Sequence, residues 1–290
     1  TVTSTDTSLA ADQRFVPTQG TEGYTWNNLM WHTSNAKNVT VQFWVKSSVT
    51  GTYGFTIRTG NAGYSYCQPY TISAANTWEK KTFIISAPTS LPNGSVSNTN
   101  GTAYYLIFGL GVGSDFDVGA DEIWTNVANG QGRTSHTNLM ATNGATWQLT
   151  GFQIEAGDIA TPFEHRSYGE ELALCQRYYH TSFSGETTIG GSHPANYAGK
   201  VFSWCDQYGS SPDRVAFNYQ WPVQMRDIPT VTMYGNQWTS ARMSKYNGGS
   251  SEYTIDYASG VSRNGLGGYY DVAGTNGDFV VAYVEASAEL

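Results

Sequence analysis

The sequence has 290 residues, enough for one large β-domain or two ordinary ones. Only 13% of the residues are charged, 14% are aromatic and 32 are glycine, which excludes a protein built of charged helices and favours strands and turns. The net charge of −8 and the scattered basic residues exclude nucleic acid as a partner, and the absence of any apolar run near 18 residues excludes membrane insertion by a helix.

The first half of the chain predicts strands separated by turns. Residues 39–45 alternate between apolar and polar side chains, which is the period of a half-buried strand. Gly51 closes a turn into a second strand at residues 52–57, so the two segments are expected to form a hairpin. Because loops rich in Ser, Asn and Gly separate the strands, we expect an antiparallel sandwich. Further strands are expected at residues 78–85, 104–112 and 145–154.

A single short helix is predicted at residues 169–179. Its apolar side chains follow a helical stripe from Leu172 through Cys175 to Tyr179, with glutamates at its start and an arginine near its end, which suits the helix dipole. The chain then returns to strands, so the helix is the expected junction between two β-rich domains. The strands after it are expected at residues 200–204, 214–220, 230–234, 252–257 and 278–287.

Three acidic residues lie close together in the sequence and offer hard oxygen ligands for a structural calcium ion: Asp115, Asp117 and Asp121. A solvated acidic loop is the alternative, and a glycosidase would need two such carboxylates at a fixed separation. No nucleophile motif or phosphate-binding loop is present, so we expect no enzyme.

The cysteines and histidines predict no metal centre. The three cysteines, Cys67, Cys175 and Cys205, have no CxxC spacing and are expected to be small buried side chains. The five histidines are far apart in the sequence and form no ligand pair. Sparse cysteine also fits folding in a reducing cytoplasm.

With nine tryptophans and 20 tyrosines, some aromatic rings must be exposed, where they can stack on sugar faces. Eight of them lie in loop-like surroundings and are the candidate glycan-binding residues; the alternative is that they pack in the core or in a subunit interface. Trp44, Trp78 and Trp147 lie on predicted strands and are candidates for the core or for a sheet face. The eight candidates are Trp26, Trp31, Tyr64, Tyr66, Trp238, Tyr246, Tyr269 and Tyr270.

Residues 151–179, GFQIEAGDIATPFEHRSYGEELALCQRYY, resemble a module of bacteriophage tail-fibre and virion structural proteins. In that module a carbohydrate-binding-module-like jelly roll ends in a Gln-Leu-Glu-x-Gly strand, which a Thr-Pro-Phe-Glu turn and a Glu-Leu-x-Leu-Cys-Gln-Arg-Tyr-Tyr helix follow. Ile154 stands where leucine is usual. The resemblance implies an all-β fold, with a jelly-roll sandwich at residues 1–160, a helical junction at 161–180 and a C-terminal β-domain at 181–290.

The junction residues also make physical sense as a brace between two domains. Pro162 fixes its own φ and biases Thr161 toward an extended conformation, which ends the sandwich strand. Phe163 is the expected apolar anchor, and the charged side chains lie close enough to pair across the junction. The expected brace residues are Pro162, Phe163, Glu164, Arg166, Glu171, Arg177, Tyr178 and Tyr179.

The resemblance implies a phage virion protein of the tail fibre or tail tip, made in the cytoplasm of the bacterial host. Its expected partners are further copies of itself, as a homotrimer, other virion proteins and a host surface glycan used for attachment. Two alternatives stay open, a purely structural virion component and a polysaccharide depolymerase. The sequence begins at Thr1 without a methionine, which suggests that an N-terminal part is missing, and its Glu-Leu end suggests a native C-terminus.

Overall fold

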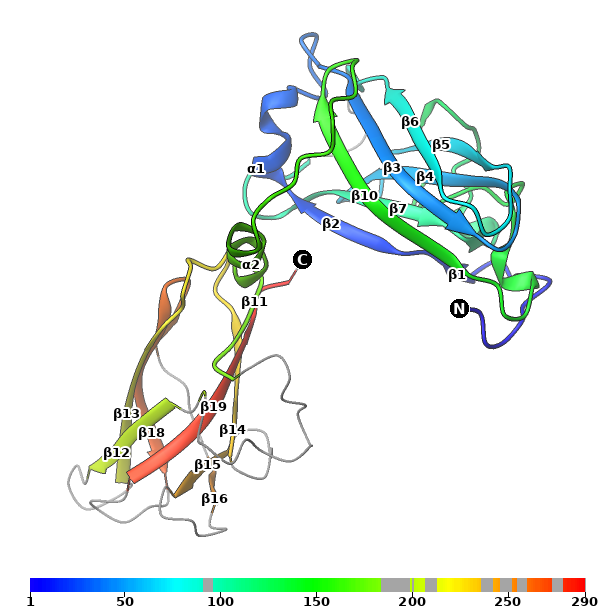
Figure 1. The fold of residues 1–290 in the computed structure, drawn as a ribbon. Coiled ribbons are helices and arrows are strands. Elements are labelled where there is room, and N and C mark those ends of the chain that lie inside the picture. The colour runs from blue at the N-terminus through cyan, green and yellow to red at the C-terminus, as the bar shows by residue number, and fades with distance from the viewer. Residues whose placement is uncertain are drawn as a thin grey trace. The chain divides into compact units, whose positions relative to one another are not determined.

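A computed structural model of the chain describes residues 1–90, 96–183, 199, 201–206, 213–235, 242–245, 252–254, 260–272 and 279–289. These residues lie mostly in strands, and their helices are few and short, which confirms the expected all-β fold (Figure 1). The chain divides into two compact units, unit 1 at Thr1–His165 and unit 2 at Arg166–Glu289. The boundary between them lies within the range expected for the junction.

Unit 1 contains two antiparallel sheets whose apolar faces share one core. In the smaller sheet β3 (Val39–Ser47) lies between β10 (Trp147–Ala156) and β6 (Glu79–Ile85). The larger sheet has the strand order β2-β7-β4-β5-β9. Its strands are β2 (Thr18–Glu22), β7 (Thr102–Gly109), β4 (Gly51–Thr59), β5 (Ser65–Ile72) and β9 (Trp124–Thr125), and β1 (Arg14–Phe15) pairs separately with β8 (Gly111–Val112).

The predicted hairpin between β3 and β4 is wrong. These strands lie in different sheets, and β4 pairs instead with β5 and β7. The turn before β4 carries the chain from one layer of the sandwich to the other, and Gly51 adopts a φ of 133°, which other residues rarely adopt. Both strands are buried on the side that faces the other sheet, so alternation predicted the strands but not their partners.

Aromatic rings fill the space between the two sheets. Phe43 of β3 meets the edge of Phe108 of β7 with 5.2 Å between ring centroids, and Phe55 of β4 lies 5.1 Å from the same ring. All three are buried. Burying a side chain of this size stabilises the fold by roughly 1.5–3 kcal/mol, and edge-to-face contact adds to that.

The loops of unit 1 carry its short helices. Helix α1 (Gly23–Trp26) leads directly into a 3-10 helix at Asn27–Leu29, and two more 3-10 helices lie at Ser114–Phe116 and Leu139–Ala141. Each buries at least one apolar side chain against the sandwich, so these loops are part of the core.

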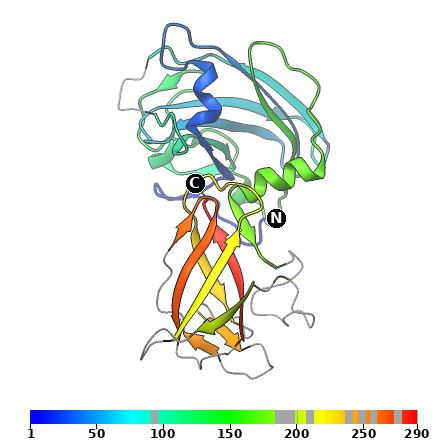
Figure 2. The ribbon, with the colours of Figure 1, turned by 90° about the vertical axis from the view of Figure 1, so that its left-hand side faces the viewer.

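Unit 2 is arranged around its last strand, β19 (Phe279–Ser287), which Figure 2 shows among its neighbours. The C-terminal half of β19 pairs with β11 (Tyr179–Thr181) and β14 (Thr230–Tyr234), and its N-terminal half pairs with β12 (Val201–Asp206) and β15 (Arg242–Lys245). The sheet extends through β13 (Asp213–Gln220), β16 (Glu252–Thr254), β17 (Val261–Ser262) and β18 (Gly265–Val272).

Both faces of β19 are covered. Val280, Ala282, Val284 and Ala286 belong to one apolar cluster, whereas Tyr283 packs against Phe183 in another. This strand therefore reads as a continuous apolar run, as expected for a strand that is buried on both sides.

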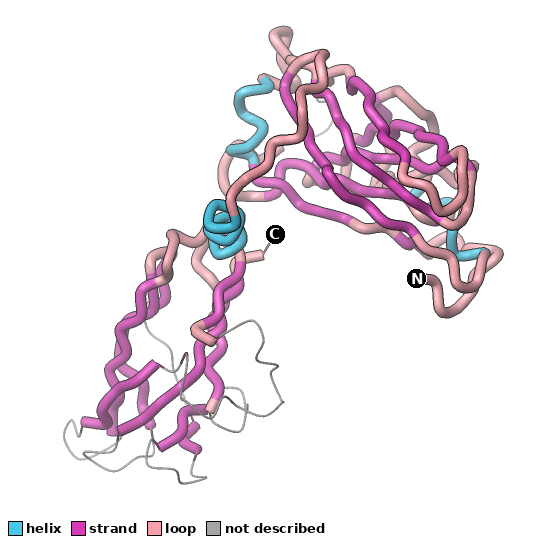
Figure 3. The backbone as a smooth tube through the Cα atoms, in the orientation of Figure 1, coloured by secondary structure: helices cyan, strands magenta, loops and turns pink. Residues whose placement is uncertain are grey.

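Helix α2 (Tyr168–Gln176) is shorter than predicted (Figure 3). None of its residues is buried. Ser167 and Glu170 form a capping box that fixes its first turn. The predicted apolar stripe is wrong: Leu172 is 40% exposed, Cys175 is exposed and Tyr179 belongs to β11. No helix in the described part of the chain combines the length and apolar character needed to cross a membrane.

Candidate functional site

The outer face of the three-stranded sheet of unit 1 carries exposed aromatic side chains. Val39, Val41, Phe43 and Val45 of β3 are fully buried, so the residues between them point away from the core. Trp44 is one of these and is 44% exposed. The register places it between Thr150 of β10 and Lys80 of β6, in the middle strand of the sheet.

A second exposed indole lies beside the first residues of β6. Trp78 is 41% exposed, and the Lys46 ammonium lies 5.3 Å from the centroid of its ring. A cation over a tryptophan ring contributes roughly 0.5–1 kcal/mol at an exposed position. The outer face therefore combines indole rings with amine and hydroxyl groups. We call this set the outer-face aromatic patch and define it as Trp44, Lys46, Trp78, Lys80 and Thr150.

The Thr-Pro-Phe-Glu turn of the sequence is tied to this same face. The Gln42 side chain donates to the Thr161 carbonyl oxygen over 2.5 Å, and the Thr161 hydroxyl donates to Glu155 Oε2 over 2.7 Å. The Glu164 backbone N–H donates to Gln153 Oε1 over 2.9 Å. These bonds give a structural reason why Gln153 and Glu155 of the strand accompany Thr161 and Glu164 of the turn in the sequence motif. They also lower the pKa of Glu155, chiefly through the Thr161 hydroxyl and then through the Thr161 backbone N–H.

The turn adds Phe163 to the edge of the patch. Gly151 has a φ of 58°, and a Cβ placed on it would lie 3.4 Å from Trp44 Cδ1 and 4.0 Å from Phe163 Cδ2. A Cβ there would be in ordinary van der Waals contact with both rings, so it is the positive φ that favours glycine at this position. Phe163 is 41% exposed, so it is not the buried anchor that the sequence predicted.

The remaining brace residues make contacts within unit 2. Arg166 pairs with Glu171 over 3.3 Å, and the Arg177 carbonyl accepts from the Arg226 backbone N–H. The Tyr178 carbonyl accepts from the Ala288 backbone N–H, and the Tyr179 hydroxyl donates to Glu285 over 2.9 Å. Burial, followed by the Glu285 contact, raises the pKa of Tyr179 to about 12.

The loop aromatics proposed from the sequence are mostly not exposed. Trp26, Trp31 and Tyr66 are 7%, 8% and 4% exposed, so the prediction of exposed rings is wrong for them. Trp26 and Trp31 lie 4.6 and 5.1 Å from the Tyr104 ring, because α1 and the following 3-10 helix fold both indoles onto the sandwich. The Trp26 indole N–H donates to the Thr21 hydroxyl and that of Trp31 donates to the Lys37 carbonyl, so neither ring is buried with an unsatisfied donor.

The other five candidates fall into three cases. Tyr64 is half-buried and stacks on Trp124 with 5.2 Å between centroids. Trp238 and Tyr246 lie outside the described residues. Tyr269 and Tyr270 lie in β18 and not in a loop, and their side chains are outside the described part.

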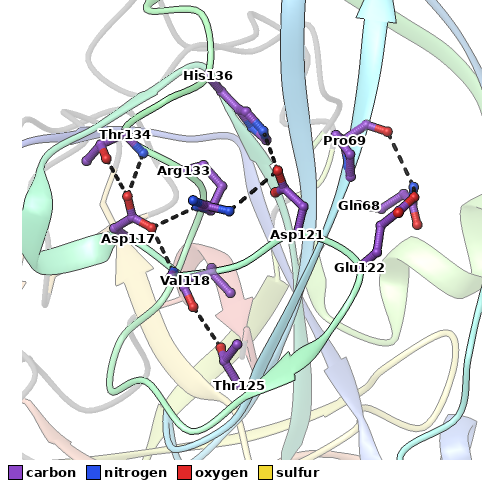
Figure 4. A network of polar contacts seen from close by, with 11 residues as sticks. Gln68, Pro69, Asp117, Val118, Asp121, Glu122, Thr125, Arg133, Thr134 and His136 are labelled. Carbon is purple, nitrogen blue, oxygen red and sulfur yellow. Dashed lines mark hydrogen bonds and ion pairs between the residues drawn. The ribbon is translucent and has the colours of Figure 1, made fainter.

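A polar network joins the loops after β8 and β9 (Figure 4). Arg133 Nε lies 2.9 Å from Asp117 Oδ1, and its Nη1 lies 3.4 Å from Asp121 Oδ2. His136 Nε2 contacts the same Asp121 oxygen over 3.2 Å. Burial alone would raise the pKa of Asp117, but donors from Thr134 and Gly119, together with Arg133, hold it below its usual value.

This network does not fit the calcium site predicted from Asp115, Asp117 and Asp121. Both Asp117 oxygens accept hydrogen bonds from protein donors, and Asp115 is exposed. Calcium needs six or more oxygen ligands, whereas here a guanidinium group occupies the space between two of the three carboxylates.

The network continues to Cys67 of β5. Ligand atoms of Cys67, Asp121 and His136 all lie within 4.8 Å of one another, the only such group of three among the described residues. Cys67 is buried, as predicted, and burial above all raises the pKa of its thiol to about 12. Asp121 Oδ1 and His136 Nδ1 are buried without a hydrogen-bond partner, which costs about 1–3 kcal/mol for each group.

Sequence reasoning missed this cluster because its members are 54 and 15 residues apart and follow no ligand spacing. Nothing in the sequence groups His136 with a cysteine and an aspartate, because the expected absence of a ligand pair concerned the histidines only among themselves. Only the pairing of β5 with β4 and the course of two loops bring the three side chains together.

No family model matches the chain, and the searches of curated proteins and of solved structures also find no match.

Proposed function

We propose that the chain is a non-enzymatic virion protein of a phage tail that contributes to host attachment by binding a surface glycan through the outer-face aromatic patch. The observation that carries the proposal is the exposure of Trp44 and Trp78 on one face of a regular sheet. The junction motif at residues 151–179, which resembles that of phage tail proteins, supports the virion role.

The patch has the chemistry that a sugar needs. Indole rings stack on the apolar C–H face of a pyranose, while neighbouring amines and hydroxyls exchange hydrogen bonds with its hydroxyl groups. Lys80 and Thr150 lie directly opposite Trp44 on the neighbouring strands. A sheet holds these groups more rigidly than a loop does, so less conformational entropy is lost on binding.

Repeated copies would make weak individual sites sufficient. A site made of a few side chains on the exposed face of a sheet buries little of its ligand, so its contacts are weak when they act alone. In a homotrimer on a particle, the second and third contacts become intramolecular and raise the overall affinity. The proposal therefore includes self-assembly and contact with other virion proteins.

The acidic network argues against the depolymerase alternative. A glycosidase needs one carboxyl group with a raised pKa to act as an acid. Asp117 instead has a lowered pKa, and Arg133 pairs with both Asp117 and Asp121. A carboxyl group whose pKa is lowered, as for Asp117, is ionised and cannot donate the required proton.

The test is binding of the purified protein to cells of a susceptible host, with isolated surface polysaccharide as competitor and with the product size followed in the same tube. Trp44→Ala and Trp78→Ala should each weaken binding by about tenfold or more, because an aromatic contact at the centre of an interface contributes more than about 1.4 kcal/mol. Tyr24→Ala is the matched control, since Tyr24 is 57% exposed but lies in α1, outside the patch.

Three results would contradict the proposal. Equal binding by the tryptophan variants would remove the patch as the site. Shortening of the polysaccharide would favour the depolymerase. Absence of binding by the assembled oligomer to any susceptible host would favour a purely structural virion role.

A further inference from the structure

Three distant segments of unit 1 converge on one buried point. Cys67 lies in the middle of β5, Asp121 in the loop before β9, and His136 in the loop before the 3-10 helix at Leu139–Ala141. Their ligand atoms lie within 4.8 Å of one another. Backbone hydrogen bonds already tie both loops to the larger sheet: the Glu122 N–H donates to the Cys67 carbonyl and the Thr137 N–H donates to the Thr52 carbonyl. Figure 4 shows Asp121 and His136 pointing toward each other.

The three side chains are well shielded from water. Cys67 is fully buried, and the side chains of His136 and Asp121 are 8% and 32% exposed. A Cβ placed on Gly54 of the neighbouring strand would lie 2.8 Å from Cys67 Sγ and 3.0 Å from His136 Nδ1. The thiol and the imidazole therefore crowd against the same piece of bare backbone, and only glycine leaves them that room.

Two polar atoms of the cluster are buried without a hydrogen-bond partner. His136 Nδ1 and Asp121 Oδ1 are both buried and have no hydrogen-bond partner. Native structures satisfy almost all such groups, and the neighbouring Cys67 thiol can serve only Asp121, which leaves His136 Nδ1 for a further ligand.

We propose that Cys67, Asp121 and His136 bind one divalent transition metal ion of the zinc class. A thiolate, an imidazole and a carboxylate are the ligands that zinc takes in proteins, and three of them with one further position make a tetrahedral site. Zinc bonds of about 2.0–2.3 Å place neighbouring ligand atoms roughly 3.3–3.8 Å apart at tetrahedral angles. The ligand atoms of the cluster lie within 4.8 Å of one another, so small side-chain rotations would bring them to this separation.

The surroundings supply the outer contacts that such sites need. Arg133 contacts Asp121 Oδ2 over 3.4 Å and is itself fixed by Asp117 over 2.9 Å. Charged groups that contact a ligating carboxylate orient it, and their loss weakens metal binding. Calcium does not fit, because it requires oxygen ligands and avoids thiolate.

A cysteine nucleophile is a weaker explanation of the same three residues. Cysteine, histidine and aspartate also form catalytic triads, but a nucleophile must reach its substrate. Cys67 is fully buried within β5, where a substrate cannot reach it. The proposed ion is therefore structural: it joins two loops to β5 and leaves the glycan-binding patch unchanged.

The experiment uses the full chain with Cys175→Ser and Cys205→Ser, so that Cys67 is the sole cysteine. The protein is refolded with Zn²⁺ or with EDTA, dialysed and assayed for metal per chain. A parallel sample refolded with Co²⁺ is examined for the charge-transfer absorption that a cobalt–thiolate bond produces. We expect about one metal per chain, a clear charge-transfer band and a melting temperature several degrees higher than in EDTA.

His136→Gln is the test variant and Arg14→Gln a control, because Arg14 lies over Phe116 and does not contact the cluster. His136→Gln should lose the bound metal and the charge-transfer band, whereas Arg14→Gln should keep both. Metal retained equally by His136→Gln would overturn the assignment. Absence of the cobalt band in the parent protein would also overturn the metal-site assignment. The three side chains would then form a hydrogen-bonded group in which the Cys67 thiol is a donor.

Discussion

The two units of the chain use different cores for the same class of fold. Unit 1 packs aromatic rings between two sheets, with Phe43 and Phe55 both against Phe108. Unit 2 instead packs mainly valine, alanine and methionine side chains, with Trp221, around β19, whose neighbours lie along both of its edges. The first core depends on a few large side chains, and the second depends on the pairing of one strand. The difference predicts where each unit is most sensitive to substitution.

The largest effect is expected from Phe55→Ala in unit 1. Phe55 is fully buried and contacts Phe83, Phe108 and Phe152, so its removal should cost about 3–5 kcal/mol. Hydrogen exchange followed by mass spectrometry can report each unit separately. Peptides of unit 1 should lose protection while those of β19 keep theirs. Equal loss in both units would show that they do not unfold independently.

A somewhat smaller effect is expected from Met225→Ala in unit 2. Met225 is fully buried in the cluster that contains Val280 and Val284, and its truncation should cost about 2–5 kcal/mol. Urea unfolding with the same peptide readout would check this. Methionine cores repack more readily than aromatic ones, so a cost above that of Phe55→Ala would contradict the comparison.

Gly54→Ala should destabilise unit 1 by about 1–3 kcal/mol through overpacking, because the added methyl group meets Cys67 Sγ and His136 Nδ1. Gly169→Ala is the matched control in unit 2. Its Cβ would meet nothing within 4 Å and lies in α2, so this change should stabilise the helix by about 0.5–1 kcal/mol. Thermal melts of both variants test whether the glycine in β4 is required by its neighbours.

The smallest effect is expected from acid. The pKa of Asp117 is lower in the folded state than its ordinary value of 3.8, so its ionised form stabilises unit 1 above that pH. This contribution is lost as the pH falls through the folded pKa. Asp117→Asn should therefore flatten the pH dependence of unit 1 stability below about pH 4 and leave that of unit 2 unchanged. An unchanged acid profile for the variant would show that Asp117 is not the responsible group.

Local patterns determined much of this protein before any tertiary structure was known. Alternation at residues 39–45 placed β3 within two residues of its observed end, and α2 starts within one residue of its predicted start. These features depend on neighbours in the chain: on the two-residue period of a strand and on a capping box. The strand before Pro162 ends at Ala156, so the proline is not what ends it.

Only the tertiary structure decided which side chains meet. It buried Trp26 and Trp31, exposed Trp44, moved β4 into the second sheet and brought His136 to Cys67. Sequence composition could say that some rings must be exposed but not which ones. The physical reason is that burial and contact in a sandwich depend on strand pairing between distant segments, and alternation specifies a strand's two faces without specifying what covers them.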